Sequence, residues 1–248
     1  MRAAYSIAKR EVFSYFVSPI AYVVTLVWLL WCGLQYYLMA GLYAGSPNLS
    51  AGGSPLTAFF GGSVLFFIPL LVFAPVLTMR LLAEERHTGT LEPLLTAPVT
   101  RLSVVLGKYA AAMVFWISLW IPTVLYVWLT SQFGSVDAGT VFASYLGVFG
   151  IGLYYMAIGL AMSALAKNQI VAALLTFMVL SGLFAIGLLS FIEAFAAHRD
   201  LIDYISLWGH MQAFSKGIVD SRFVVFDISV AGLFVYLAFR ALDGRRWQ

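Results

Sequence analysis

Residues 84–88 of this 248-residue chain read EERHT and have the side-chain types of a catalytic site. Two glutamates followed by a histidine occur in the motifs of membrane proteases. The zinc-protease pattern His-Glu-x-x-His is absent, however, and Glu84 and Glu85 fall at the edge of a long apolar segment. An intramembrane enzyme therefore remains only an alternative interpretation, and no catalytic residue is predicted.

A second group of titratable residues follows the fifth apolar segment. It contains His198, Asp200, Asp203 and His210. Their spacing matches no recognised set of zinc ligands, so we expect ordinary polar residues on short helices and no metal site.

The sequence also lacks a nucleotide-binding loop. The only Gly-Lys pair, Gly107-Lys108, is followed by Tyr109 and preceded five residues earlier by Leu102. This does not fit the phosphate-binding pattern G-x-x-x-x-G-K-[ST]. No cofactor is predicted for this chain.

The composition indicates which elements carry these residues. Hydrophobic residues make up 62% and charged residues 10% of the chain, and the mean hydropathy is +0.93. Uncharged runs of roughly 20 residues, long enough to cross about 30 Å of hydrocarbon, recur along the whole length. We therefore predict an all-α integral membrane protein with one transmembrane domain over residues 1–248. Its six expected spans are 20–42, 58–79, 104–130, 140–166, 168–192 and 222–240.

The distribution of Lys and Arg predicts the orientation. Of the 14 Lys and Arg residues, only Arg199, Lys216 and Arg222 fall in segments that lie outside if the N-terminus is cytoplasmic. The positive-inside rule then places both termini and the 80–101 connector in the cytoplasm, and 193–221 outside. The net charge of +3 arises from the same asymmetry, so no nucleic-acid partner is expected.

The first 19 residues are expected to form an amphipathic helix in the inner headgroup layer. On a helix, Tyr5, Val12 and Phe16 share one face, while Lys9 and Arg10 lie on another. Ser18-Pro19 should end this elbow helix before the first span. A frayed basic tail is the alternative.

The connector after the second span should contain two helical pieces. We expect the second span to continue as a helix through MRLLAEERH, residues 79–87, until Gly89 lets the chain turn. A short helix then begins, with Thr90 as its N-cap and Glu92 at its positive end. Pro98 ends it, and a new helix starts at Thr100 and Arg101.

The short helix needs a binding partner. Its apolar stripe consists of Leu91, Leu94 and Leu95, and an isolated helix below about 12 residues is unstable in water. The membrane surface or another protein could cover the stripe. Since 88–99 contains no Lys or Arg and its only charge is Glu92, a groove on a protein is favoured.

Two segments resemble a known family. APVLTMRLLAEERHTGTLEPLLTAPVT, residues 74–100, resembles the signature region of permease subunits of type-2 ABC (ATP-binding cassette) transporters, especially their gliding-motility-associated branch. YISLWGHMQAFSKGIVDSRFVVF, residues 204–226, resembles the same branch just before its last span. Six spans and an N-terminal elbow helix agree, so the resemblance covers essentially the whole chain.

The resemblance implies a function. The segment 89–98 would be the coupling helix, which docks into a separate ATPase subunit that binds ATP and Mg²⁺. The implied interface residues are Glu84, Glu85, Arg86, Gly89, Thr90, Leu91, Glu92, Leu94 and Leu95. The other implied partners are membrane lipid and a second permease copy or paralogue, and we allow for an auxiliary extracytoplasmic subunit. An exporter-type complex in the bacterial cytoplasmic membrane is expected, with an ATP-independent secondary transporter as a further alternative.

Four residues are candidates for gating or for the transport path. Pro69 and Pro75 in the second span and Pro122 in the third should kink helices. Asp227 lies 13 residues before Arg240, so it should sit within the outer leaflet and face protein or water. It either lines the outer mouth or pairs with a neighbouring helix.

Overall fold

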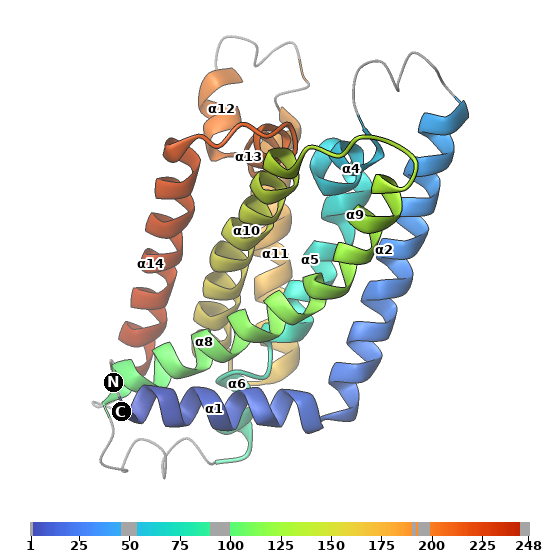
Figure 1. Ribbon diagram of the computed structural model, residues 1–248. Coiled ribbons are helices and arrows are strands. Elements are labelled where there is room, and N and C mark those ends of the chain that lie inside the picture. The colour runs from blue at the N-terminus through green and yellow to red at the C-terminus, as the bar shows by residue number, and fades with distance from the viewer. Residues whose placement is uncertain (1, 46–53, 90–99, 190–191, 193–198, 244–248) are drawn as a thin grey trace.

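The computed structural model describes residues 2–45, 54–89, 100–189, 192 and 199–243. Every regular element among these residues is helical, and six stretches are long and apolar enough to cross a membrane. The prediction of an all-α, six-helix membrane protein is thus confirmed. The central α10 (Ala138–Leu165) packs against four of the other spans, through α5 (Val64–Thr78), α8 (Arg101–Trp120), α11 (Gln169–Leu188) and α14 (Ser221–Asp243) (Figure 1).

The chain begins with α1 (Arg2–Val17), which lies across one end of the bundle at a steep angle to the spans (Figure 1). α1 ends at Val17 and α2 (Pro19–Gly45) starts at the proline, so the helix break lies at Ser18, as Ser18-Pro19 predicts. α1 packs mainly on α8. We call this end of the molecule the α1 end.

The second span is built from three pieces. The short α4 (Pro55–Thr57) and a wider π turn, η1 (Ala58–Gly62), precede α5 (Val64–Thr78). The break lies at Gly61, whose φ of 148° suits glycine alone, and a Cβ there would lie 2.4 Å from Cγ of Met211. Gln35 donates from Nε2 to the Phe59 carbonyl at 3.0 Å, so α2 satisfies one group of this irregular turn.

α5 ends earlier than the sequence predicts. The helix was expected to continue through residues 79–87, but it stops at Thr78, residues 79–82 form a turn, and α6 (Ala83–His87) follows. The expectation of one continuous helix is therefore wrong. The reason is tertiary, because α10 supplies the hydrogen bonds that a continued helix would have made, as described below.

The third span is also interrupted. It consists of α8 (Arg101–Trp120), one 3-10 turn η2 (Ile121–Thr123) and α9 (Val124–Ser131). The turn contains Pro122, which cannot donate a backbone hydrogen bond. Thr100 caps α8 as expected, since its Oγ1 accepts from the backbone N–H of Ser103 at 3.3 Å.

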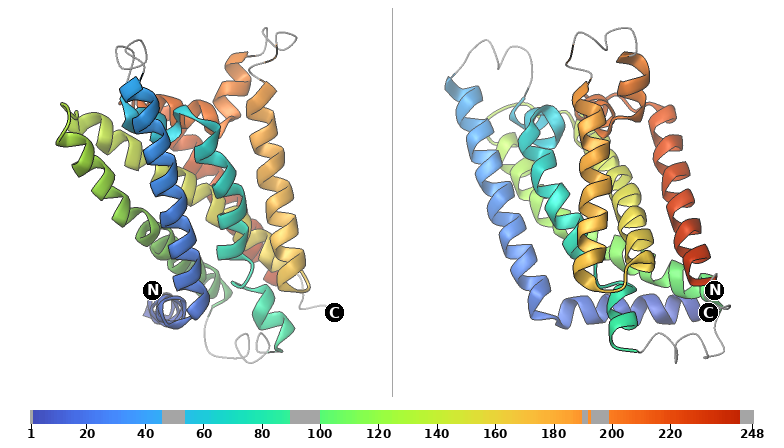
Figure 2. Two further views of the ribbon diagram at one scale, coloured as in Figure 1. Left: turned by 90° about the vertical axis from the view of Figure 1, so that its right-hand side faces the viewer. Right: turned by 180° about the vertical axis from the view of Figure 1, so that it is seen from behind.

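The remaining elements complete the bundle. α11 (Gln169–Leu188) follows α10 after a short turn, and α14 (Ser221–Asp243) is the last span. Between them, α12 (Arg199–Ile205) and α13 (Leu207–Ser215) lie at the end opposite α1 (Figure 2). We call this the α13 end.

Glycines let the helices approach α10 closely. A Cβ on Gly152 would lie 2.3 Å from Nε1 of Trp116, and one on Gly159 would lie 2.1 Å from Oγ1 of Thr78. Such contacts are sterically impossible, so both positions need glycine while their neighbours keep their places. Both glycines therefore allow close helix packing in the fourth span.

The polar junction at the α1 end

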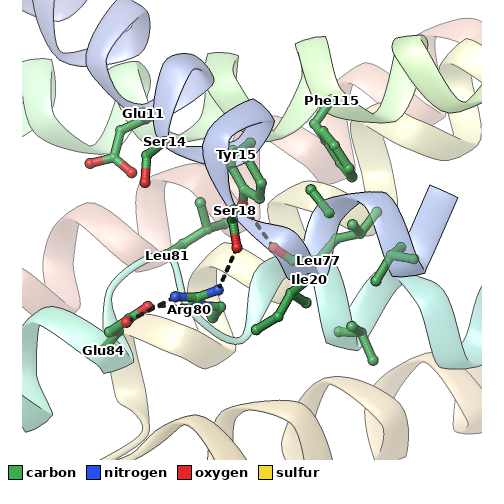
Figure 3. Close-up of a pocket in the computed structure, with 13 residues that line it drawn as sticks. Glu11, Ser14, Tyr15, Ser18, Ile20, Leu77, Arg80, Leu81, Glu84 and Phe115 are labelled. Carbon is green, nitrogen blue, oxygen red and sulfur yellow. Dashed lines mark hydrogen bonds and ion pairs between the residues drawn. The ribbon is translucent and has the colours of Figure 1, made fainter.

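Helix α1 is attached to the C-terminal end of α5 beside a pocket. The Tyr15 hydroxyl donates to the Leu77 carbonyl at 2.8 Å, and Arg80 reaches back to Oγ of Ser18 at 3.5 Å (Figure 3). Burial raises the pKa of Tyr15, so its hydroxyl keeps the proton that it donates. These contacts join residues that are 62 positions apart in the sequence.

Arg80 and Glu84 form a two-point ion pair across the turn. Nε of Arg80 lies 2.7 Å from Oε2 of Glu84, and Nη2 lies 3.1 Å from Oε1. The hydrogen bond from Arg80 lowers the pKa of Glu84, and the bond to Glu84 raises the pKa of Arg80. Each side chain is about one third exposed, at 34% and 35%, so solvent weakens the pair.

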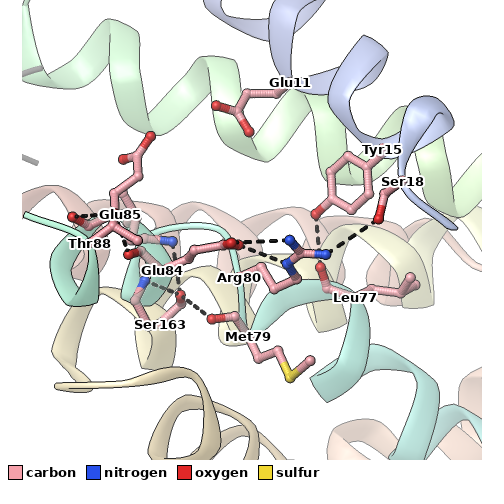
Figure 4. Close-up of polar contacts among 12 residues, drawn as sticks. Glu11, Tyr15, Ser18, Leu77, Met79, Arg80, Glu84, Glu85, Thr88 and Ser163 are labelled. Carbon is pink, nitrogen blue, oxygen red and sulfur yellow. Dashed lines mark hydrogen bonds and ion pairs between the residues drawn. The ribbon is translucent and has the colours of Figure 1, made fainter. Parts of the chain in front are cut away.

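Ser163 on α10 holds the turn between α5 and α6. Its Oγ accepts from the backbone N–H groups of Leu82 and Ala83, each at 3.0 Å. The same hydroxyl donates to the Met79 carbonyl at 3.2 Å (Figure 4). Because one side chain satisfies three main-chain groups of the turn, the helix can end here inside a packed region.

Lys108 connects three elements at the centre of this region. Its Nζ lies 3.1 Å from Oε1 of Glu11 on α1 and 2.9 Å from Oε1 of Glu85 on α6. The Lys108 side chain is 2% exposed, and the two carboxylate side chains are 17% and 16% exposed. A buried ammonium is stable only with such partners.

Sequence reasoning missed this role of Lys108 and considered it as part of the Gly107-Lys108 pair. A signal was present, because a lysine eight residues into an apolar helix must find a partner. The partners themselves could not be identified, since Glu11 lies 97 positions away in the sequence.

The contacts that join α1, α6 and α8 at this end form what we call the junction. Arg86 and Arg101 connect the junction to α10 and α14. The Arg86 guanidinium donates to the carbonyls of Ala164 and Ala166 at the C-terminal end of α10. A cation at that place also complements the helix dipole. Arg101 at the start of α8 forms an ion pair with Asp243 at the end of α14.

The predicted docking residues fall into two groups. Glu84, Glu85 and Arg86 lie in the junction, where each contacts the chain's own side chains or main chain. Gly89 has a φ of 73° and turns the chain as expected. The other five, Thr90, Leu91, Glu92, Leu94 and Leu95, lie outside the described residues.

The three prolines occupy different settings. Pro69 and Pro75 are buried within α5, which runs through both of them without a break. Pro122 lies in the 3-10 turn of the third span. Among the described residues of the second span, the breaks lie at Gly61 and at residues 79–82 instead.

Asp227 is paired at the α13 end. Oδ1 of Asp227 lies 3.1 Å from Nδ1 of His210 on α13, and both side chains are at most 3% exposed. Nε2 of His210 lies 2.8 Å from the Tyr204 carbonyl, and Phe223 stacks on the imidazole with ring centroids 4.3 Å apart. Of the two positions that the sequence allows, Asp227 therefore takes the one paired with a neighbouring helix.

The His210–Asp227 contact requires a shared proton. The Tyr204 carbonyl can only accept, so Nε2 of His210 must carry a hydrogen. Nδ1 and the carboxyl oxygen then hold one further proton between them, either as imidazolium with carboxylate or as imidazole with carboxylic acid. Both forms have zero net charge, which suits a site closed to water.

Comparison with known proteins identifies the family. The family model described as ABC-2 family transporter protein matches residues 5–239, which is nearly the whole chain. The chain belongs to the ABC-2 transporter family. A search of curated proteins gives no match.

Membership of the ABC-2 family decides the general function. This ABC-2 protein is a multi-pass membrane permease of an ABC transporter, a transport subunit and not itself a catalytic enzyme. The alternatives of an intramembrane enzyme and of an ATP-independent secondary transporter are set aside. The junction of α1, α6 and α8 is thus part of a transporter's membrane subunit.

Proposed function

We propose that this permease is driven by a separate ATPase subunit that docks on residues 89–98. The observation that carries the proposal is the attachment of α6, the helix that leads into this segment. Glu85 on α6 forms an ion pair with Lys108 on α8. Ser163 on α10 accepts a hydrogen bond from the first residue of α6, and Arg86 donates to the Ala166 carbonyl just after α10. A force applied at 89–98 would therefore be passed directly to α1, α8 and α10.

In this proposal, the contacts of α6 with α8 and α10, and through Lys108 with α1, would let a short helix move the bundle. α6 alone has five residues and cannot act as a stiff lever. Its ion pairs and hydrogen bonds instead couple it to helices of 16, 20 and 28 residues. Closure of two ATPase subunits around ATP and Mg²⁺ would move the junction as one piece, and α10 would carry the motion toward the α13 end.

The α1 end is proposed to face the cytoplasm of a bacterium, with both termini on that side of the cytoplasmic membrane. The bias of Lys and Arg supports this orientation. α1 carries exposed Tyr5, Phe13 and Val17 along its length, as expected of a helix at a headgroup layer. An exporter-type dimer with a second copy or a paralogue follows from the resemblance of residues 74–100 and 204–226.

The same two segments support the narrower kinship with the gliding-motility-associated branch. We propose it on the sequence resemblance alone. It allows transport of a substrate or the powering of an envelope assembly with an auxiliary extracytoplasmic subunit.

The docking proposal is tested by replacing Leu94 and Leu95 together with Asp. We expect the protein to insert and fold normally, because both residues would contact only the partner. Mild-detergent purification should then recover the permease without its ATPase, whereas the wild-type chain copurifies with it. Mass spectrometry of all bound chains measures the difference.

A matched control places two Asp residues at the other end of the molecule. Ile218 and Val219 are 58% and 50% exposed in the loop before α14, so Ile218→Asp with Val219→Asp adds the same charge far from the junction. This control should keep the ATPase. Full ATPase binding by the Leu94→Asp, Leu95→Asp protein would contradict the proposed docking site.

A further inference from the structure

A pocket opens where α1 turns into α2. It has a cavity volume of about 70 Å³, is partly open to the outside, and is bordered by α1, α2, α5, α8, α6 and the turn before α6. Figure 3 shows its polar side chains, Glu11, Ser14, Arg80 and Glu84, on one side and Phe115 on the other. The pocket is thus polar at one end and apolar at the other.

Both carboxylates at the polar end are paired with cations of the chain itself. Arg80 binds Glu84, and Glu11 is bound by Lys108 at 3.1 Å and by Arg10 at 3.5 Å. The Glu84 carboxylate is fully used by Arg80. Glu11 bonds Lys108 through Oε1, and its Oε2 receives no hydrogen bond from the described residues. This oxygen can accept from a ligand.

Hydrogen-bond donors line the same pocket. Nη1 of Arg80 makes only a long contact, 3.5 Å, to Oγ of Ser18. The Ser14 hydroxyl also lines the pocket. A guanidinium edge and two hydroxyls are the groups that bind a phosphate oxygen. One end of the pocket therefore offers an acceptor for a cation next to donors for an anion.

The apolar end faces the surface that a bilayer covers. Ile20, Val24 and Val76 line it, and Ile20 at the start of α2 is 49% exposed. α2 is one of the six membrane-crossing helices. A hydrocarbon chain can therefore run from the pocket along α2 without leaving the membrane.

We propose that this pocket binds a membrane phospholipid whose head group carries a primary ammonium beside its phosphate. The ammonium would donate to Oε2 of Glu11, the phosphate would accept from Arg80 and the serine hydroxyls, and an acyl chain would lie along Ile20 and Val24. Such a lipid would touch α1, α2 and the α5 end together. Its binding strengthens the attachment of α1 to the junction.

The unbonded oxygen of Glu11 separates this ligand from an anionic lipid. A phosphoglycerol head group has no ammonium, so it would offer this carboxylate oxygen only neutral hydroxyl donors. Lys9 is exposed on α1 and does not line the pocket, so it provides a separate contact for anionic lipids. The experiment must therefore measure the lipid held in the pocket itself.

The test uses the purified full-length permease and native mass spectrometry. Short-chain phosphatidylethanolamine, short-chain phosphatidylglycerol and free phosphoethanolamine are titrated separately. Ser14→Trp fills the pocket from an exposed position on α1 and should not disturb folding. Val17→Trp adds the same side chain to α1 at an exposed residue, and Val17 is not among those that line the pocket.

We expect phosphatidylethanolamine to bind the wild-type and Val17→Trp proteins equally. Its affinity should fall about tenfold or more in Ser14→Trp, since several charge-assisted hydrogen bonds are lost. Glu11→Gln should reduce the preference for phosphatidylethanolamine over phosphatidylglycerol, with the thermal midpoint measured to check folding.

Three results would overturn the proposal. The first is phosphatidylethanolamine binding that Ser14→Trp leaves unchanged. The second is a Ser14→Trp-sensitive site that prefers phosphatidylglycerol. The third is free phosphoethanolamine binding as tightly as the lipid, which would assign the pocket to a soluble ligand. None of these measurements depends on the ATPase subunit, so the docking proposal is tested separately.

Discussion

Nζ of Lys108 lies 2.9 Å from Oε1 of Glu85, and this ion pair joins the N-terminal half of α8 to the short helix α6. The same ammonium binds Glu11 on α1 at 3.1 Å. One buried cation therefore holds together an end helix, a membrane span and the helix that leads into residues 90–99. The α1 end is therefore held together by ion pairs between three helices.

Replacing Lys108 with Met should destabilise the protein by about 3 kcal/mol, because two partly buried carboxylates would lose their shared cation and repel each other. The unfolding of purified protein in detergent measures this loss. Lys167→Met is the control, since Lys167 is exposed after α10, and its unfolding should shift by less than about 0.5 kcal/mol. Equal shifts for the two variants would argue against the buried network.

Ser163→Ala should loosen the turn between α5 and α6. The buried N–H groups of Leu82 and Ala83 would lose their acceptor, which costs about 1–3 kcal/mol. Ser144→Ala on the same helix is the matched control, because the Ser144 hydroxyl only donates to the Thr140 carbonyl of its own helix. Amide hydrogen exchange should rise at residues 79–87 in Ser163→Ala alone. Unchanged exchange there would mean that the serine does not hold the turn.

Asp227→Asn and Asp227→Ala should behave differently. The Asn amide can donate to Nδ1 of a neutral His210, so it replaces the shared proton, and we expect a loss below about 1 kcal/mol. Ala leaves that buried nitrogen without a partner and removes packed atoms, at a cost of about 2–4 kcal/mol. Thermal unfolding of the two variants tests the shared-proton arrangement. An equal loss of stability in Asp227→Asn and Asp227→Ala would contradict this arrangement.

The Arg80–Glu84 pair predicts a small acid-sensitive contribution to stability. The pKa of Glu84 is lowered from its ordinary value of 4.5, so folding favours the carboxylate. The contribution is complete above about pH 4.5 and disappears as the pH falls through the lower folded-state pKa. Because the pair is about one third exposed, it should stay below about 1 kcal/mol.

Glu84→Gln provides the comparison for this pH dependence. The difference in unfolding free energy between wild type and Glu84→Gln should be constant near neutral pH and shrink in acid. A difference that grows as the pH falls would show that another group is responsible.

Several features of this permease follow from local sequence alone. Long uncharged segments must become helices in a bilayer, because only then are their main-chain groups bonded within the segment, and the described part of the chain contains six helices of this kind. Ser18-Pro19, Thr100 and Gly89 mark a break, an N-cap and a turn for reasons confined to a few neighbouring residues.

The tertiary structure decided which polar residues meet. The helix after Thr78 ends because Ser163, 84 residues beyond Met79, bonds the turn. Lys108 finds Glu11, and Asp227 finds His210, only after separate helices have packed. Hydropathy records how much each segment avoids water, but it carries no information on which helix faces which. A buried charge must have a partner, and the packing of the helices selects it.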